Sequence, residues 1–222
     1  MRSIQVGPVG SVVVRRHWVT VAAAASVVGF VAWWFLSGAS SSASESSSAP
    51  DSAAGAPVAR ALAYSYFAAI GIVLARIDIQ THRLPNAIVL PGYVVGGVLL
   101  TIASAASGEW SALLRALIGM ATLYAFYFVL RLLRPGGMGG GDVKLAGVIG
   151  LFLAYQGWGS LMVGAFSAFL LGGLFGVALI VLRHASRTTA IPFGPWMLAG
   201  AWVGIFAGET IASGYTLLLL PG

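Results

Sequence analysis

The sequence contains no cysteine, so disulfide bonds, thiolate metal sites and cysteine nucleophiles are all excluded. Charge is also scarce: charged residues make up 8% of the chain, whereas a soluble domain carries about 25%. Only six of the 222 residues are acidic. A chain with so little polar surface is expected to use a lipid bilayer as its solvent.

Apolar residues, in contrast, make up 59% of the chain and gather in long runs. A run of about 20 apolar residues is the length of a membrane-spanning helix. Lipid offers no hydrogen-bond partners, so a spanning segment must satisfy its own backbone, which favours helices. The strand-like alternation of a membrane β-barrel is not found. We therefore predict an all-α, polytopic membrane helix bundle with about seven transmembrane helices.

The apolar runs divide the chain into three parts. Residues 1–36 form a basic N-terminal segment with a first helix, 37–57 a Ser/Ala-rich extracytoplasmic loop, and 58–222 the main membrane domain. The first run is long for a signal peptide, which favours a retained helix over a cleaved leader. The predicted spans cover residues 18–36, 58–77, 87–106, 110–131, 143–157, 159–182 and 191–208. The fifth is short for a crossing, and 217–220 is expected at the membrane interface.

Basic residues lie between the apolar runs rather than in one patch, so topology explains the net charge of +6 better than nucleic-acid binding does. Alternating spans place ten of the twelve basic residues on one side and only Arg60 and Arg115 on the other. By the positive-inside rule, the side with ten is cytoplasmic and holds the N-terminus. These ten are Arg2, Arg15, Arg16, Arg76, Arg83, Arg131, Arg134, Lys144, Arg183 and Arg187.

The same alternation leaves two acids on the cytoplasmic side, Asp78 and Asp142. Each has an ordinary explanation when taken alone: Asp78 could pair with a neighbouring arginine, and Asp142 could cap a helix. Both, however, fall at the end of a membrane helix beside Gly- or Pro-bearing sequence. Acids at membrane depth are costly and mark functional sites, so their shared depth favours a joint role.

Two carboxylates that face each other can share one proton, with one acting as a base on water and the other as an acid toward a carbonyl oxygen. Asp142 precedes an apolar run and is expected at a helix N-terminus, where the helix dipole favours the anion. Asp78 is expected at a C-terminus, where the dipole favours the protonated form. The hypothesis is that Asp142 is the base and Asp78 the acid. Lys144 could hold Asp142 ionised, bind a substrate carbonyl or extend to the headgroups.

Other patterns carry no chemistry. Small residues recur at four-residue spacing, as in Gly92/Gly96 and Gly200/Gly204/Gly208, which predicts close helix packing within one bundle rather than dimerisation. The three histidines lie in separate basic segments without metal-ligand spacing. The stretch Gly136-Gly-Met-Gly-Gly-Gly141, directly before Asp142, lacks the Gly-Lys-Ser/Thr ending of a phosphate loop.

Three segments together resemble the type IV prepilin peptidases, a family of Gly-x-Gly-Asp membrane aspartic proteases. Gly139-Gly-Gly-Asp-Val-Lys-Leu145 resembles the Gly-x-Gly-Asp motif, and Ile77-Asp-Ile-Gln-Thr-His-Arg-Leu-Pro-Asn86 resembles the segment of the first aspartate. Ile191-Pro-Phe-Gly-Pro195 resembles the third recurrent segment. The three stand in the family's order within residues 58–208.

The resemblance implies that Asp78 and Asp142 are the catalytic pair of an endopeptidase that needs no metal or other cofactor. It would remove short basic leader peptides from type IV prepilin or pseudopilin precursors, at the cytoplasmic face of the bacterial inner membrane. Gly139, Gly141, Lys144, Pro85, Pro192, Phe193, Gly194 and Pro195 are expected to support the pair or to bind the substrate. Many family members also carry cysteine pairs and a methyltransferase activity; this chain has no cysteine, so a short, peptidase-only form is expected.

Two other classes of protein remain open. Paired acids at broken helices also serve as proton relays, so a proton-coupled transporter or channel that uses Asp78 and Asp142 is the alternative. No inverted repeat accompanies them, and the acid-bearing spans have no counterpart among the later ones. The third reading is an assembly scaffold without activity.

Overall fold

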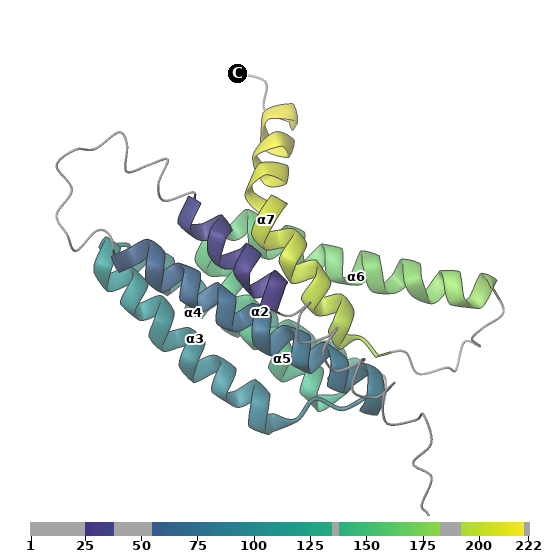
Figure 1. The fold of residues 1–222 in the computed structure, drawn as a ribbon. Coiled ribbons are helices and arrows are strands. Elements are labelled where there is room, and N and C mark those ends of the chain that lie inside the picture. Colours follow the sequence, from purple (N-terminus) through teal and green to yellow (C-terminus); the bar gives the residue numbers. More distant parts are fainter. Residues whose placement is uncertain (1–24, 38–54, 135–137, 183–191, 220–222) are drawn as a thin grey trace, which may run out of the picture.

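The computed structural model describes residues 25–37, 55–134, 138–182 and 192–219. Within these ranges every regular element is an α-helix, which confirms the predicted fold class. The helices α2, α3, α4 and α6 are each long and apolar enough to cross a membrane. In chain order the helices are Ala25–Ser37, α2 (Gly55–Thr81), α3 (Asn86–Ser107), α4 (Trp110–Leu133), α5 (Gly140–Gln156), α6 (Trp158–Val181) and α7 (Gly194–Leu219) (Figure 1).

The short helix α5 lies at the centre of the bundle. It packs against α3, α4, α6 and α7, and it buries an unbroken run from Leu145 to Tyr155. Its 17 residues span about 26 Å at the usual rise per residue, in keeping with the prediction that the fifth span is short. Because neighbours surround α5, both its first turn and its last turn are positioned by other helices.

The far end of α5 is held by polar contacts. Arg115 on α4 donates to the backbone oxygens of Ala154, at 2.6 Å, and of Tyr155, at 2.9 Å. These carbonyl groups have no partner within the helix, and a cation beside them also complements the helix dipole. The hydroxyl of Tyr64, on α2, donates to the oxygen of Phe152 at 2.8 Å. The position of α5 along the bundle axis is therefore fixed at the end opposite Asp142.

The small residues of α7 let it lie directly on α6. A Cβ atom added at Gly204 would lie 2.5 Å from the oxygen of Ser160, and one added at Gly208 would lie 2.5 Å from its Cα. At Gly200 an added Cβ would lie 2.7 Å from the Cα of Ala168. This confirms, for α7, the prediction that such residues serve packing within one bundle. Figure 1 shows the C-terminal part of α6 extending away from the other helices.

A similar contact joins α4 to α5 and gives a stability prediction. A Cβ atom added at Gly150 of α5 would overlap the backbone oxygen of Gly119 on α4. We expect Gly150→Ala to lower the free energy of unfolding by about 1–3 kcal/mol, because backbone must move to admit the methyl group. The measurement is thermal unfolding in detergent micelles.

The matched control is Gly97→Ala on α3, where an added Cβ would have no neighbour within 4 Å. That variant should unfold at the wild-type temperature or slightly above, because alanine favours helix over glycine. Equal unfolding temperatures for Gly150→Ala and wild type would contradict the close contact of α4 and α5.

Helix α7 is longer than predicted. The expected end at residue 208 is wrong, since α7 continues to Leu219 and takes in residues 217–219, which were expected at the interface. Residue 220 lies outside the described residues. Glu209 directly follows the predicted end of the span. Its carboxylate instead accepts the N–H of Ser160 at 2.9 Å, so it satisfies a donor in the first turn of α6 while α7 runs on.

Helix α2 is also longer than predicted. It begins at Gly55, so residues 55–57 of the expected loop are helical, with Pro57 in a first turn that tolerates proline. Ser37 belongs to the preceding helix. The rest of the Ser/Ala-rich loop, and residues 18–24 of the first predicted span, lie outside the described residues. The helix Ala25–Ser37 packs on α2, where Phe35 stacks on Tyr64 with ring centroids 4.4 Å apart.

Candidate active site

Asp78 lies in the last turn of α2 and is buried, with 4% of its surface exposed. The helix ends at Thr81 and is followed by His82, a non-glycine residue in the left-handed region with φ of 51°. The carboxylate Oδ2 of Asp78 accepts the backbone N–H of Gly194 at 3.0 Å. Gly194 is the first residue of α7. Asp78 therefore sits between the end of one helix and the start of another that is 116 residues away in the chain.

Asp142 lies in the first turn of α5, as predicted. Gly139 precedes the helix in an extended conformation, and its N–H donates to Asp142 Oδ2 at 3.1 Å. This is the carboxylate half of a capping box, which satisfies a backbone donor at the helix start. The ordinary explanation for Asp142, a helix cap, is thus correct. The same bond orients the carboxylate, so the explanation does not compete with a role in chemistry.

The surroundings of Asp142 raise the pKa of its carboxyl group. This residue lies outside the four helices that are long enough to cross a membrane. The pKa of Asp142 is raised to about 6: burial is the largest cause, the negative charge of Asp78 also raises it, and the Gly139 N–H acts to lower it. A carboxyl group with such a pKa gains and loses a proton close to neutral pH, which suits acid–base chemistry.

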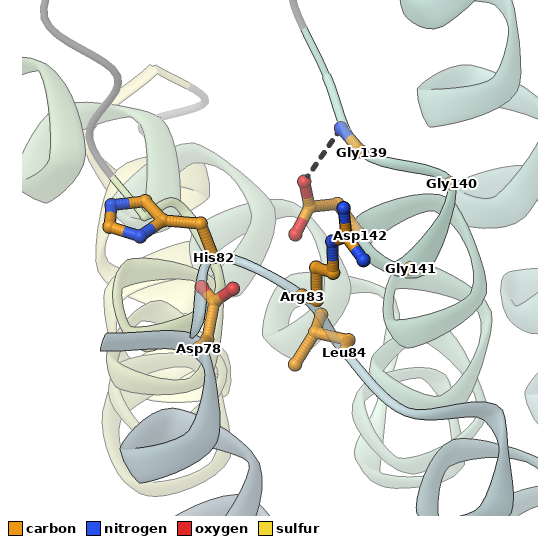
Figure 2. Close-up of a pocket in the computed structure, with 8 residues that line it drawn as sticks. All are labelled: Asp78, His82, Arg83, Leu84, Gly139, Gly140, Gly141 and Asp142. Carbon is orange, nitrogen blue, oxygen red and sulfur yellow. Dashed lines mark hydrogen bonds between the residues drawn. The ribbon is translucent and has the colours of Figure 1, made fainter. Parts of the chain in front are cut away.

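Both carboxyl groups line one pocket of about 220 Å³. Figure 2 shows Asp78, from the end of α2, and Asp142, from the start of α5, with their carboxyl groups directed into the same space. The remaining lining residues are His82, Arg83, Leu84, Gly139, Gly140 and Gly141. The structure thus brings the two predicted acids together, and it builds the rest of the pocket from the segment after α2 and the glycines before Asp142.

The glycines of this stretch allow close approach. A Cβ atom added at Gly141 would lie 2.6 Å from Leu84 Cβ and 3.3 Å from the backbone nitrogen and oxygen of Leu84. One added at Gly140 would lie 2.5 Å from a guanidinium nitrogen of Arg131, on α4. The start of α5 can therefore lie against the segment after α2 only because Gly141 lacks a side chain, and Gly140 leaves room for the Arg131 side chain of α4.

The predicted supporting residues fall into different places. Gly139 and Gly141 line the pocket. Lys144 does not line it: its ammonium group donates to Asn86 Oδ1 at 2.9 Å, which ties α5 to the start of α3. Pro85 is also outside the lining and is the residue directly before α3, with an extended backbone. Proline disfavours helix at the preceding Leu84, as predicted, so the segment after α2 is not helical.

The third predicted segment reaches the site through Gly194. Its N–H bonds Asp78, whereas Pro192, Phe193 and Pro195 do not line the pocket. The aromatic ring of Phe193 lies 5.4 Å from that of Phe169 on α6 and 6.3 Å from that of Tyr127 on α4, measured between ring centroids. This segment thus contributes a backbone donor and an aromatic anchor.

Besides Gly140, which lies between the predicted Gly139 and Gly141, three lining residues were not predicted: His82, Arg83 and Leu84. They come between Asp78 and Pro85, both of which the sequence analysis had singled out. One sequence feature could have indicated them: Pro85 disfavours helix at Leu84. The residues between Asp78 and Pro85 then leave the helix beside the carboxylate. The left-handed backbone of His82 had no such signal, since that conformation is uncommon for any residue but glycine. Among the described residues, no three side chains gather as a metal-ligand set.

The fold and the pocket define a multi-pass helical membrane protein with two carboxyl groups in one site. Residues 65–177 match the type IV leader peptidase family, and the chain belongs to this family. It is 31% identical over 150 residues to a protein of Aeromonas salmonicida, 34% over 155 to one of Pseudomonas putida and 30% over 157 to one of Bacillus subtilis. All three are named prepilin leader peptidase/N-methyltransferase.

These alignments cover 67%, 67% and 69% of this chain, and 50%, 50% and 59% of the respective relatives. The chain thus spans about half the length of the first curated relatives it matches. No solved structure matches it. Family membership confirms the predicted resemblance. The matched residues include the first two of the three segments, whereas Ile191–Pro195 lies beyond them.

Proposed function

We propose that this protein is an aspartic endopeptidase that removes the leader peptide from type IV prepilin or pseudopilin precursors. The observation that carries the proposal is the single pocket lined by both Asp78 and Asp142, in a chain of the type IV leader peptidase family. The curated relatives are named for the same activity. The proposal includes the residues expected to perform the chemistry.

The reaction needs one ionised and one protonated carboxyl group. The ionised group takes a proton from a water molecule, whose oxygen adds to the carbonyl carbon of the scissile peptide. The protonated group gives its proton to the carbonyl oxygen. The tetrahedral intermediate then collapses: the carbon–nitrogen bond breaks and the nitrogen takes the proton that was removed from water. One hydroxyl of the intermediate returns a proton to the other carboxyl group, and a new carboxyl group and amine are released. Because Asp142 gains and loses its proton close to pH 6, the pair can hold one proton under physiological conditions.

The pocket also suits a peptide substrate. A peptide inside a helix has its carbonyl groups bonded within the helix, so it must be extended before both carboxyl groups can reach it. The pocket forms where α2 has ended and α5 begins, beside an open segment kept extended by Pro85. Backbone groups of the Gly139–Gly141 stretch border it. An extended chain could therefore lie along the glycines with little steric cost.

The site is proposed to face the cytoplasm from the inner membrane. Arg83 lines the pocket and Arg131 lies against Gly140, so basic side chains surround the end of the bundle that holds the two acids. Arg115, on the same helix as Arg131, lies at the opposite end of α5. We restrict the proposal to cleavage of a peptide bond, because two carboxyl groups account for hydrolysis and not for methyl transfer.

The test reconstitutes the purified protein in liposomes with a prepilin precursor and follows the product by mass spectrometry. The expected result is one cut that separates a short basic leader from the rest of the precursor. Failure to cleave any prepilin or pseudopilin precursor tried would count against the function. A proton flux in the same liposomes, dependent on both acids and without cleavage, would instead favour the transporter.

A further inference from the structure

The start of α7 presents one free backbone donor to the candidate site. Pro195 has no N–H, and the N–H groups of Trp196 and Met197 both donate to the oxygen of Phe193, each at 3.1 Å. The first turn of α7 therefore has only the N–H of Gly194 to offer, and this group donates to Asp78 Oδ2 at 3.0 Å. Asp78 thus lies at the positive end of the α7 dipole, although it also lies at the end of α2.

Glycine is the residue this contact requires. A Cβ atom added at position 194 would lie 2.7 Å from Asp78 Oδ2 and 3.2 Å from its Cγ. Any side chain here would separate the backbone donor from the carboxylate. The role of glycine at this position is therefore close approach to Asp78.

Phe193 anchors this donor to the bundle. Its ring packs with those of Tyr127 and Phe169, whose centroids are 5.5 Å apart. It also fills a notch in α6, because a Cβ atom added at Gly172 would lie 2.9 Å from Phe193 Cε2. The backbone that carries the Gly194 N–H is thus held against α4 and α6.

We infer that Phe193, Gly194 and Pro195 form a clamp that holds Asp78 as the carboxylate anion and makes Asp78 the base of the pair. A donor fixed on the charged form of a carboxyl group favours that form. Both acids accept a backbone N–H, but the bond from Gly194 to Asp78 is buried and the bond from Gly139 to Asp142 is exposed, so the former is the stronger. Asp142 then holds the proton and acts as the acid. This reverses the roles predicted from the dipoles of the two helices that carry the acids, because that prediction did not include α7. Phe193 is a positioning residue: it acts through the backbone of Gly194. The roles of base and acid rest on the proposed peptidase function. The hydrogen bond from Gly194 to Asp78 can be tested without it.

Other charged groups also face Asp78 and belong in the test. His82 and Arg83 follow it in the chain, and Asp142 faces it from α5. Arg131 of α4 lies beside Gly140. The described part of α7 carries a single charged residue, Glu209, at the far end of α6. The α7 contribution to Asp78 is therefore the Gly194 N–H and the helix dipole.

The experiment uses the two backbone amides that bond the two carboxylates as separate reporters. The sequence contains one Met–Gly pair, Met138-Gly139, and two Phe–Gly pairs, Phe175-Gly176 and Phe193-Gly194. Protein labelled with ¹⁵N-glycine and with ¹³C-carbonyl methionine or phenylalanine therefore gives one NMR signal for Gly139 and two for the other pairs. Phe175→Leu removes the Gly176 signal and so assigns it.

The expected result is that the Gly194 signal titrates at lower pH than the Gly139 signal, while Gly176 stays constant. Asp78→Asn should abolish the Gly194 titration, and Asp142→Asn should leave it in place with a lower midpoint, because a like charge is removed. Phe193→Ala and Phe193→Tyr remove the labelled phenylalanine carbonyl, so these variants carry ¹³C-carbonyl alanine or tyrosine instead, and Gly194 is the one signal that wild type lacks under the same labelling. In Phe193→Ala the Gly194 midpoint should be about one pH unit higher than in wild type, the effect of weakening a hydrogen bond to a charged group. In Phe193→Tyr it should return to the wild-type value.

A reversed order of the two midpoints would overturn the assignment of Asp78 as the base. A Gly194 signal that does not titrate, or that titrates equally in Phe193→Ala, would overturn the clamp. Neither the order of the midpoints nor the titration of the Gly194 signal depends on cleavage. A protein that fails to cut a prepilin can therefore still support or refute the clamp. Where cleavage is measured, Phe193→Ala should shift the acidic limb of the pH–rate profile and leave the basic limb unchanged.

Discussion

Replacing either Asp78 or Asp142 by asparagine is expected to abolish cleavage of a prepilin, lowering kcat/KM by about 10⁴-fold. An amide of the same shape can neither accept a proton from water nor donate one as a carboxylic acid does. The loss should be similar for the two variants and not additive in the double variant, because each acid works only with the other. Initial cleavage rates in proteoliposomes measure the effect.

The asparagine variants should remain folded. The amide oxygen of asparagine can still accept the N–H of Gly194 at position 78, or that of Gly139 at position 142, so both helix starts keep their partner. The matched control is Glu109→Gln, an exposed acid before α4 whose side chain makes no capping hydrogen bond. It should cleave at the wild-type rate. Cleavage retained by either aspartate variant would refute the two-carboxylate mechanism.

The pairing of the two acids could be predicted from the sequence because it follows from topology. Alternating apolar runs, together with the distribution of basic residues, left only Asp78 and Asp142 on one side of the membrane. Membrane topology thus places residues that are distant in the sequence at the same end of the bundle, as long-range packing does in a soluble protein. The place of Asp142 was predictable as well, since an acid between glycines and an apolar run indicates a helix start.

Contacts between distant segments could not be predicted in the same way. The bond from Gly194 to Asp78 and the bond from Ser160 to Glu209 join segments 116 and 49 residues apart. Neither has a local pattern that indicates its partner. The central place of α5 was hidden for another reason: a helix buried on all faces shows no apolar stripe, and in a membrane protein the lipid-facing helices are equally apolar.

The contact that brings the acids together depends on Gly141, and substitution there is expected to have the second large effect. We expect Gly141→Ala to lower kcat/KM about 100-fold, because an error of about 1 Å in the position of a catalytic group has a cost of that order. The added Cβ would lie 2.6 Å from Leu84 Cβ, with the backbone nitrogen and oxygen of Leu84 each at 3.3 Å. The start of α5 must therefore move away from the segment after α2, and Asp142 moves with it, away from Asp78.

The effect should fall on chemistry more than on stability. The far end of α5 is still held by Arg115 and Tyr64, and position 141 lies at the pocket rather than in the centre of the bundle. Gly97→Ala is again the control, since its added methyl group has no neighbour within 4 Å. A separate readout is the pKa of Asp142, reported by the Gly139 amide: with Asp78 farther away, it should fall below its wild-type value of about 6. Wild-type cleavage together with an unchanged pKa would show that the start of α5 does not need this close approach.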